Sequence, residues 1–189
     1  MSVGALVRRR DSTATRAALL KAATVHFARE AYDSVSLRSI AAEANVDVSL
    51  VSRYFGSKEE LFAAVLAGCP GPDEMFVGEL KDFGARVARM LVDDSLHQDK
   101  PDIFLIMLHS ADHPVAAEAV RKSGEERFFG PFERYLGGKN APERVRLAAS
   151  IIKGVVMDRL ISDDLGLTPK ARERFRARLA KTLQAVIEE

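Results

Sequence analysis

Apolar residues recur at helical spacing along almost the whole chain, and this periodicity limits the fold more than any other feature. Leu19, Ala23 and Phe27, for example, repeat every four residues and would line one face of a helix. Glycine, proline and short polar clusters separate the periodic stretches, with no convincing series of alternating strands between them. The sequence therefore predicts an all-α protein of about nine helices in 189 residues.

The first sixty residues predict a long helix followed by two short helices that are joined by a tight turn. The long helix covers 13–31. The first short helix begins after Ser36, the expected N-cap, and continues to Ala44, and the second covers 48–55. Asn45 lies in the turn between them, where it tolerates the left-handed conformation that such a turn needs.

The next residues delimit the third helix and begin a fourth. Asp47 is expected to cap the third helix, and Gly56 is expected to end it. Ser57 and Glu60 have the spacing of a capping box, which predicts a fourth helix over 61–67. After a break rich in glycine and proline, the remaining predicted helices cover 73–96, 102–111, 115–136, 142–161 and 169–187.

Two short helices joined by a tight turn and supported by a longer one are typical of a helix-turn-helix, whose second helix enters the major groove of DNA. The apolar residues that would lock the pair together are Ile40, Ala41, Ala44, Val46, Val51 and Phe55. The residues of the third helix that would face outward to varying degrees are Val48, Ser49, Leu50, Ser52, Arg53 and Tyr54. Serine and arginine can hydrogen-bond bases or phosphates, and valine or leucine can touch a thymine methyl group.

Three residues outside the third helix are further candidates for phosphate contacts: Ser36, Arg38 and Lys58. Two alternatives remain open from the sequence. Tyr54 would either reach a phosphate or pack against the first helix, and Arg38 would either reach the backbone of DNA or remain a solvated surface charge. Helix-turn-helix packing also occurs in proteins that do not bind DNA, so the pattern alone leaves function open.

Charge and composition exclude several classes of protein and leave nucleic-acid binding open. The net charge is only +1, but residues 1–60 hold nine Lys or Arg against seven Asp or Glu. Arg8, Arg9 and Arg10 form a basic N-terminal arm that is either a nucleic-acid contact or a solvated terminus. A single cysteine excludes an internal disulfide, and with four scattered histidines it gives no zinc-finger spacing. No apolar run is long enough to span a membrane, so the expected location is the cytoplasm.

The stretch TRAALLKAATVHFAREAYDSVSLRSIAAEANVDVSLVSRYFGSKEELFAAVL resembles the N-terminal domain of the TetR family of transcriptional regulators. The most specific part is SLRSIAAEANVDVSLVSRYFGSKEEL, in which Tyr54-Phe55 and then Gly56-Ser57-Lys58 close the recognition helix as in the family. The resemblance implies a homodimeric, ligand-responsive repressor with a variable helical domain after the DNA-binding domain. A palindromic operator in double-stranded DNA is the expected partner.

Four positions depart from the family pattern. Ala31 replaces a usual glycine, so a left-handed conformation there would carry strain. Asn45 replaces the usual glycine of the turn. Leu50 and Ser52 replace common threonine and tyrosine residues of the recognition helix, which leaves the operator sequence undefined.

The second half of the chain is apolar on more than one helix face, as expected for a core or for the wall of a small-molecule pocket. The candidate pocket residues are Phe83, Met90, Phe104, Met107, Leu108, Phe128 and Met157. His109, Asp158 and Arg159 are candidates for polar contacts inside it. His109 and His113 are four residues apart, but Pro114 disfavours helical geometry at His113, so no metal site is predicted. The expected effector is a mainly apolar small molecule.

The last two predicted helices carry apolar stripes that are wider than packing within one domain needs. The residues expected at a dimer interface are Ile152, Val156, Phe175, Leu179 and Leu183. Two helices from each subunit would form a four-helix interface with two-fold symmetry.

Taken together, the sequence predicts a DNA-binding domain over residues 1–60 and a ligand-binding and dimerisation domain over 61–189. The expected function is that of a transcriptional repressor that an apolar ligand releases from a palindromic operator, and the alternative is an activator or a ligand-independent regulator. A helical-bundle enzyme has the least support, because the sequence contains no nucleophile–base pair, metal motif or phosphate-binding glycine loop. No cofactor is expected.

Overall fold

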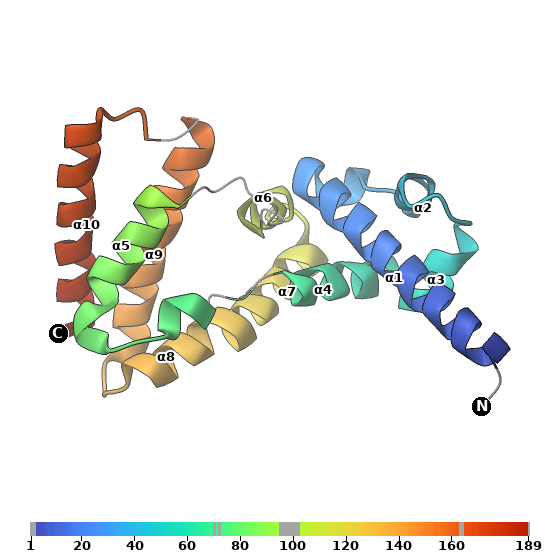
Figure 1. The fold of residues 1–189 in the computed structure, drawn as a ribbon, viewed down its shortest axis with the longest axis horizontal. Coiled ribbons are helices and arrows are strands. Elements are labelled where there is room, and N and C mark those ends of the chain that lie inside the picture. The colour runs from blue at the N-terminus through green and yellow to red at the C-terminus, as the bar shows by residue number, and fades with distance from the viewer. Residues whose placement is uncertain (1–2, 70, 72, 95–102, 163–164, 189) are drawn as a thin grey trace. The chain divides into compact units, whose positions relative to one another are not determined.

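The computed structural model describes residues 3–69, 71, 73–94, 103–162 and 165–188, and these residues form helices and connecting segments without a β-strand (Figure 1). The all-α prediction is confirmed. The chain divides into two compact units, one of residues 1–69 with 100–123 and the other of 70–99 with 124–189. No helix among the described residues has the length and apolar character that crossing a membrane requires.

The described residues of the first unit form six helices and one 3₁₀ turn. Its elements are α1 (Val3–Arg29), η1 (Tyr32–Ser34), α2 (Leu37–Glu43), α3 (Ser49–Phe55), α4 (Lys58–Gly68), α6 (Ile103–His109) and α7 (Pro114–Gly124). Its core includes Leu19 and Phe27 from α1, Ile40 from α2, Val51 from α3 and Phe62 from α4. Helix α6 packs against α1, so a segment distant in sequence completes the core of this unit.

The helix-turn-helix forms as predicted, and local side chains define its ends. The Ser36 hydroxyl accepts a hydrogen bond from the Ser39 N–H at 3.0 Å, which caps α2. Asn45 adopts φ 54°, the left-handed conformation expected in the turn, and Gly56 ends α3 with φ 79°. Ser57 forms a reciprocal capping box with Glu60 at the start of α4.

Two expectations for the first helix and its end are wrong. Helix α1 begins at Val3 and not at the expected residue 13, so its backbone includes the segment predicted as a basic N-terminal arm. Ala31 has φ −57° and ψ 144°, a conformation open to any L-residue, and the strain expected there is absent. The chain leaves α1 through an extended residue instead of a left-handed one, and this is why alanine is compatible with the position.

The second unit consists of η2 (Asp73–Phe76), η3 (Leu80–Asp82), α5 (Phe83–Asp93), a π-helical stretch (Glu125–Phe129), α8 (Gly130–Leu136), α9 (Ala141–Ile161) and α10 (Pro169–Glu188). The continuous helix expected over 73–96 is wrong in its first part, because Gly78 has φ 113°, a value that an α-helix cannot contain. Residues 95–96 lie outside the described residues. The helix expected over 115–136 is observed as α7, the π-helical stretch and α8 in succession.

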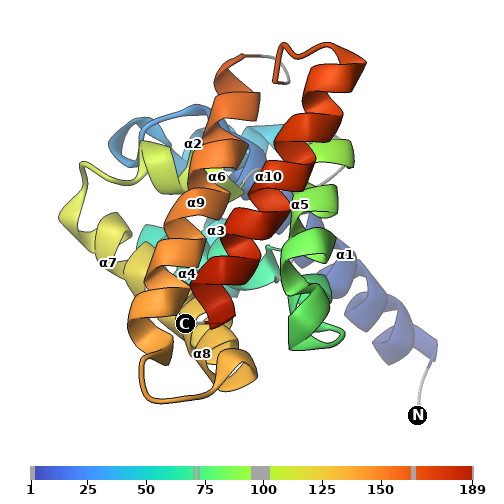
Figure 2. The same ribbon diagram turned by 90° about the vertical axis from the view of Figure 1, so that its left-hand side faces the viewer.

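Helices α5 and α10 lie side by side in the second unit, as both views show (Figure 2). Gly84 permits their close approach, since a Cβ at this position would lie 2.2 Å from the Ala180 carbonyl oxygen. The Gly84 N–H donates a 2.8 Å hydrogen bond to Oε1 of Gln184, and Nε2 of Gln184 donates to the Leu80 carbonyl at 3.0 Å. This unit is thus held together by a helix pair that is joined by both packing and hydrogen bonds.

Candidate nucleic-acid interface

Helix α3 has one buried face and one exposed face. Val51 and Phe55 point into the core of the first unit, as their spacing of four residues predicts. The exposed residues of the segment are Val48, Ser49, Ser52 and Arg53, and Leu50 and Tyr54 are half-buried. A short helix is therefore fixed by its apolar side while its hydroxyl and guanidinium groups face solvent, the arrangement that reading base edges requires.

Asp47 fixes the start of α3 through Ser49. Its Oδ1 accepts from the Ser49 N–H at 2.8 Å and from the Ser49 hydroxyl at 2.5 Å. The hydrogen bond from the hydroxyl, followed by the one from the N–H, lowers the pKa of Asp47 below its ordinary value. Because its proton is directed to Asp47, Ser49 offers lone pairs and not a donor on the exposed face.

The structure shows which of the two positions Tyr54 takes in the free protein. Its hydroxyl donates a 3.2 Å hydrogen bond to Ser12 Oγ, so the side chain packs against α1. The Arg16 guanidinium lies 4.8 Å from the centre of the Phe55 ring, a second contact between α1 and α3. Both contacts join α3 to α1; the Tyr54 contact is one of the two alternatives left open by the sequence, whereas the Arg16–Phe55 contact was not anticipated.

Of the phosphate candidates, Ser36 and Arg38 are exposed, whereas Lys58 is half-buried. The Lys58 ammonium lies 4.5 Å from the centre of the Tyr32 ring, and burial lowers the pKa of Lys58 while the charges of Asp33 and Glu59 act to raise it. The side chains of Arg8, Arg9 and Arg10 lie outside the described residues. Among the described side chains of α1, α2 and α3, the exposed cations are Arg16, Lys21, Arg29, Arg38 and Arg53.

Tyr32 is the centre of an aromatic cluster that sequence reasoning missed. Its ring stacks on Phe27 at 5.7 Å, meets the edge of Phe62 at 5.2 Å and lies 4.5 Å from the imidazole of His113. Burial, followed by the negative charges of Glu59 and Asp33, raises the pKa of Tyr32 to about 12. The cluster therefore joins α1, η1 and α4 to the turn before α7.

The candidate pocket residues fall in both units, and each group is described separately. In the first unit, α6 carries Phe104 and Met107, which are half-buried, and Leu108, which is exposed. In the second unit, Phe83 is fully buried, and Met90, Phe128 and Met157 are half-buried.

Phe83 belongs to an aromatic cluster of the second unit, together with Phe76, Phe128, Phe132 and Tyr135. Arg86 donates to the Tyr135 hydroxyl at 2.8 Å, a half-buried polar contact that the sequence did not reveal.

Of the three polar pocket candidates, two make side-chain hydrogen bonds within the second unit: Arg159 to main-chain carbonyls, and Asp158, whose Oδ1 accepts from the Ser162 hydroxyl at 3.5 Å. Arg159 is buried and donates to the carbonyls of Leu91 and Asp94 at the end of α5. Asp158 is exposed, and His109 is half-buried. Arg159 therefore holds two helices together and is not available to an effector in this arrangement.

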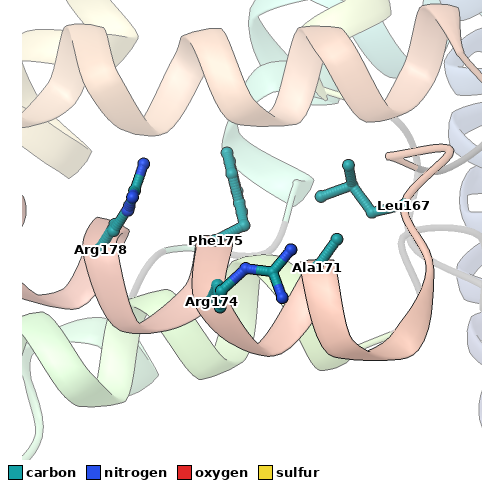
Figure 3. A pocket seen from close by; sticks show the side chains of 5 residues that line it. All are labelled: Leu167, Ala171, Arg174, Phe175 and Arg178. Carbon is teal, nitrogen blue, oxygen red and sulfur yellow. The ribbon is translucent and has the colours of Figure 1, made fainter.

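The residues expected at a dimer interface are mostly covered within one chain. Ile152, Val156, Leu179 and Leu183 are between 0 and 6% exposed and pack inside the second unit. Phe175 is half-buried and lines a groove of about 370 Å³ with Leu167, Ala171, Arg174 and Arg178, all from α10 and the segment before it (Figure 3). The exposed apolar side chains of α9 are instead Leu147 and Ile161.

Comparisons with known proteins match both halves of the chain. A family model described as "Bacterial regulatory proteins, tetR family" matches residues 19–65, and one described as "Tetracyclin repressor-like, C-terminal domain" matches 81–187. The HTH-type transcriptional repressor SCO4008 of Streptomyces coelicolor is 44% identical over 57 residues, which are 30% of this chain and 30% of that protein. The chain thus matches less than a third of the length of this curated relative.

Solved structures extend the similarity along the chain. A TetR-family regulator of Streptomyces coelicolor (SCO0857) is 29% identical with a TM-score of 0.53, covering 94% of this chain and 96% of that one. NalD of Pseudomonas aeruginosa, the secondary repressor of a multidrug efflux pump, has a TM-score of 0.65 at 21% identity and covers 91% of this chain and 95% of its own. The second likeness concerns the fold alone.

Proposed function

Because the chain belongs to the TetR family of bacterial regulatory proteins, we propose that it is a transcriptional repressor that binds a palindromic operator as a homodimer and leaves it when a small apolar effector binds. The observation that carries this proposal is the exposed face of α3, on which Arg53 and Ser52 stand in solvent while Val51 and Phe55 anchor the helix. A helix held in this way can enter the major groove without losing its packing.

In this proposal Arg53 reads a base edge, and Val48 and Leu50 contact thymine methyl groups. Ser36 and Arg38 contact phosphates, as does Lys58 once it moves off the Tyr32 ring. Arg8, Arg9 and Arg10 supply further positive charge from the start of α1. Arginine binds guanine through two parallel hydrogen bonds, so Arg53 would contribute the largest part of the sequence preference.

The dimer in this proposal forms through the exposed face of α9 and α10. Leu147, Gly154 and Ile161 follow each other at intervals of seven residues on α9 and so share one side of the helix. The groove beside Phe175 on α10 offers a second surface, in which apolar side chains alternate with Arg174 and Arg178. A second copy of the chain is the occupant, since two-fold pairing of helices is the common way to cover such faces.

Residues 1–60 then read the operator, and residues 61–189 bind the effector and form the dimer. An apolar ligand would contact the candidates of one unit, either Phe104, Met107 and Leu108 on α6 of the first unit or Phe83, Met90, Phe128 and Met157 of the second. Repression is relieved if the ligand binds better to the dimer whose two α3 helices are wrongly spaced for DNA. By linkage, the operator weakens effector binding by the same factor.

The experiment is an unbiased selection of DNA sequences by the purified protein at about 150 mM salt. We expect an inverted repeat for the wild-type chain, and we expect Arg53→Ala to lose about 1–3 kcal/mol of affinity for that repeat and to relax the preference at one base of each half-site. Arg29→Ala, an exposed arginine at the end of α1, is the matched control. A folded dimer that enriches no sequence with or without added apolar compounds contradicts the proposal.

A further inference from the structure

His113 occupies a position in the first unit where its two ring nitrogens have different partners. Nδ1 lies 3.3 Å from the Ala116 backbone nitrogen and accepts its N–H, so the imidazole caps the first turn of α7. Nε2 lies 3.3 Å from Oδ1 of Asp33 in η1. Nδ1 must be an acceptor to cap α7, and Nε2 must be a donor to bind the Asp33 carboxylate. Only the neutral tautomer with its proton on Nε2 satisfies both contacts.

Protonation of His113 changes these contacts in opposite directions. A proton on Nδ1 would face the Ala116 N–H, so that the cap is lost, and the positive end of the α7 dipole would oppose the added charge. The attraction to Asp33 would grow, but the Asp33 side chain is 80% exposed, and ion pairs of exposed carboxylates contribute little. The loss therefore outweighs the gain.

The other charged and titratable groups near the ring act on it in both directions, and Tyr32 of η1, whose ring lies 4.5 Å away, stays neutral because its pKa is raised to about 12. From α4, Glu59 attracts a charged imidazole, whereas Lys58, above the neighbouring Tyr32 ring, repels it. Asp112 precedes the histidine in the same turn and is exposed. The ionisable side chains His26 of α1 and Glu30, which follows α1, are paired with each other at 2.7 Å.

We propose that His113 is a pH-sensitive tie between α7 and the helices that present α3. The neutral ring caps α7 and holds the turn between α6 and α7 against η1, and the protonated ring releases this contact. The turn follows directly after α6, the helix that packs on α1, so its release loosens the support of the DNA-binding helices from one side. The effect on stability stands independently of function, whereas the effect on DNA rests on the proposed operator binding.

The first test compares the melting temperatures of the wild-type chain and His113→Asn between about pH 8 and about pH 5.5. Asparagine accepts the Ala116 N–H as an N-cap but does not titrate, and subtraction cancels the contributions of the three other histidines. We expect the wild-type melting temperature to fall by about 2–4 °C relative to His113→Asn as the pH decreases. Asp33→Asn should enlarge this fall, since it removes the attraction that partly compensates.

A difference between the two proteins that is constant with pH, or one that shifts in favour of the wild type at low pH, overturns the proposal. A second measurement needs no variant. The ¹⁵N shifts of His113 at pH 8 should report the neutral Nε2–H tautomer in the folded protein, and the Nδ1–H tautomer would contradict the geometry on which the proposal depends.

The consequence for DNA is tested on the selected operator. We expect the wild-type chain to lose operator affinity relative to His113→Asn as the pH falls, while both bind equally at pH 8. If both bind at pH 8 and their ratio stays constant, the tie to the DNA-binding helices is refuted while the proposed function stands. If neither protein binds any selected DNA, the proposed function fails. The melting and NMR results then still decide whether protonation of His113 releases the contact between α7 and η1.

Discussion

Gly84 and Gly68 are both helical glycines, but their surroundings differ. A Cβ on Gly84 would lie 2.2 Å from the Ala180 carbonyl and 2.9 Å from the Gln184 nitrogen, so α5 and α10 would have to separate. We expect Gly84→Ala to lower the free energy of unfolding by about 1–3 kcal/mol in a denaturant titration. Gly68→Ala is the control, because its Cβ would meet only Leu20 at an ordinary 3.5 Å. Equal stability of the two variants would contradict the close approach.

Asp47 provides a second prediction for a single side chain. The Ser49 hydroxyl is the main cause of the lowered pKa of Asp47, so Ser49→Ala should raise that pKa towards its ordinary value. Asp47 favours the folded state above its unfolded pKa, and this contribution is lost as the pH falls through the folded pKa. A carboxyl ¹³C NMR titration measures the change. Ser52→Ala, on the same helix, should leave the pKa of Asp47 unaltered, and a shift of equal size there would refute the assignment.

The residues that the sequence predicted well act over a few positions of the chain. Ser36, Asn45 and the Ser57–Glu60 pair each depend on neighbours within four residues, and their spacing can be read directly. Gly84 and Arg159 have partners 100 and 68 residues away. No local pattern marks such a partner, so the sequence did not single out Gly84, and it predicted Arg159 as a pocket residue and not as a donor to the end of α5.

At the scale of elements, the end of α5 shows how two other helices replace a local cap. Its last carbonyls need partners, since a helix leaves four of them unpaired at its C-terminus. Arg159 from α9 donates to the Leu91 and Asp94 carbonyls, and Arg172 from α10 donates to the Val92 carbonyl at 2.6 Å. Burial, together with the charge of Arg172, lowers the pKa of Arg159. The arginines therefore fix where α5 ends relative to α9 and α10.

Arg159→Met should test this arrangement, because methionine has a similar length but no donor. We expect a loss of about 1.5–3 kcal/mol in the free energy of unfolding, as carbonyls that now accept from a charged group lose that donor. Thermal and denaturant unfolding measure it. Lys181→Met, at an exposed position of α10 outside the groove, is the control and should change stability by less than about 0.5 kcal/mol. If Arg159→Met is equally mild, the cap does not stabilise the helix pair.

Helix periodicity predicted which segments are helical better than where they begin. Apolar residues continue at helical spacing through 73–82, which predicts a helix there. Gly78, however, has φ 113°, and α5 begins only at Phe83. The presence of a glycine does not by itself predict a positive φ, because glycine also occurs within helices. The π-helical stretch at Glu125–Phe129 likewise has no sequence signal that distinguishes it from α-helix.

At the scale of the whole molecule, the compact units differ from the division expected from sequence. The expected boundary after residue 60 falls inside α4, all of which lies in the first unit, and residues 100–123 join that unit as well. The packing of α6 on α1 connects segments about eighty positions apart, which helical periodicity cannot specify. Candidate pocket residues from α6 are consequently in the same unit as the recognition helix, and an effector that touches them would act on that unit directly.

The proposed dimer can be tested by comparing two apolar side chains that are equally exposed in the single chain, one inside the proposed interface and one outside it. Leu147 on α9 and Val115 on α7 are each 52% exposed in the single chain. A charge introduced at a dimer interface is buried without a partner, whereas the same charge on a free surface stays hydrated. We expect Leu147→Glu to weaken dimerisation by about tenfold or more in sedimentation equilibrium, and Val115→Glu to leave it unchanged. Operator affinity should fall with the dimer, because a monomer reads only one half-site. A Leu147→Glu chain that remains fully dimeric would place the interface elsewhere, and one that is monomeric but binds the operator as tightly as the wild type would show that the pairing of recognition helices is not needed.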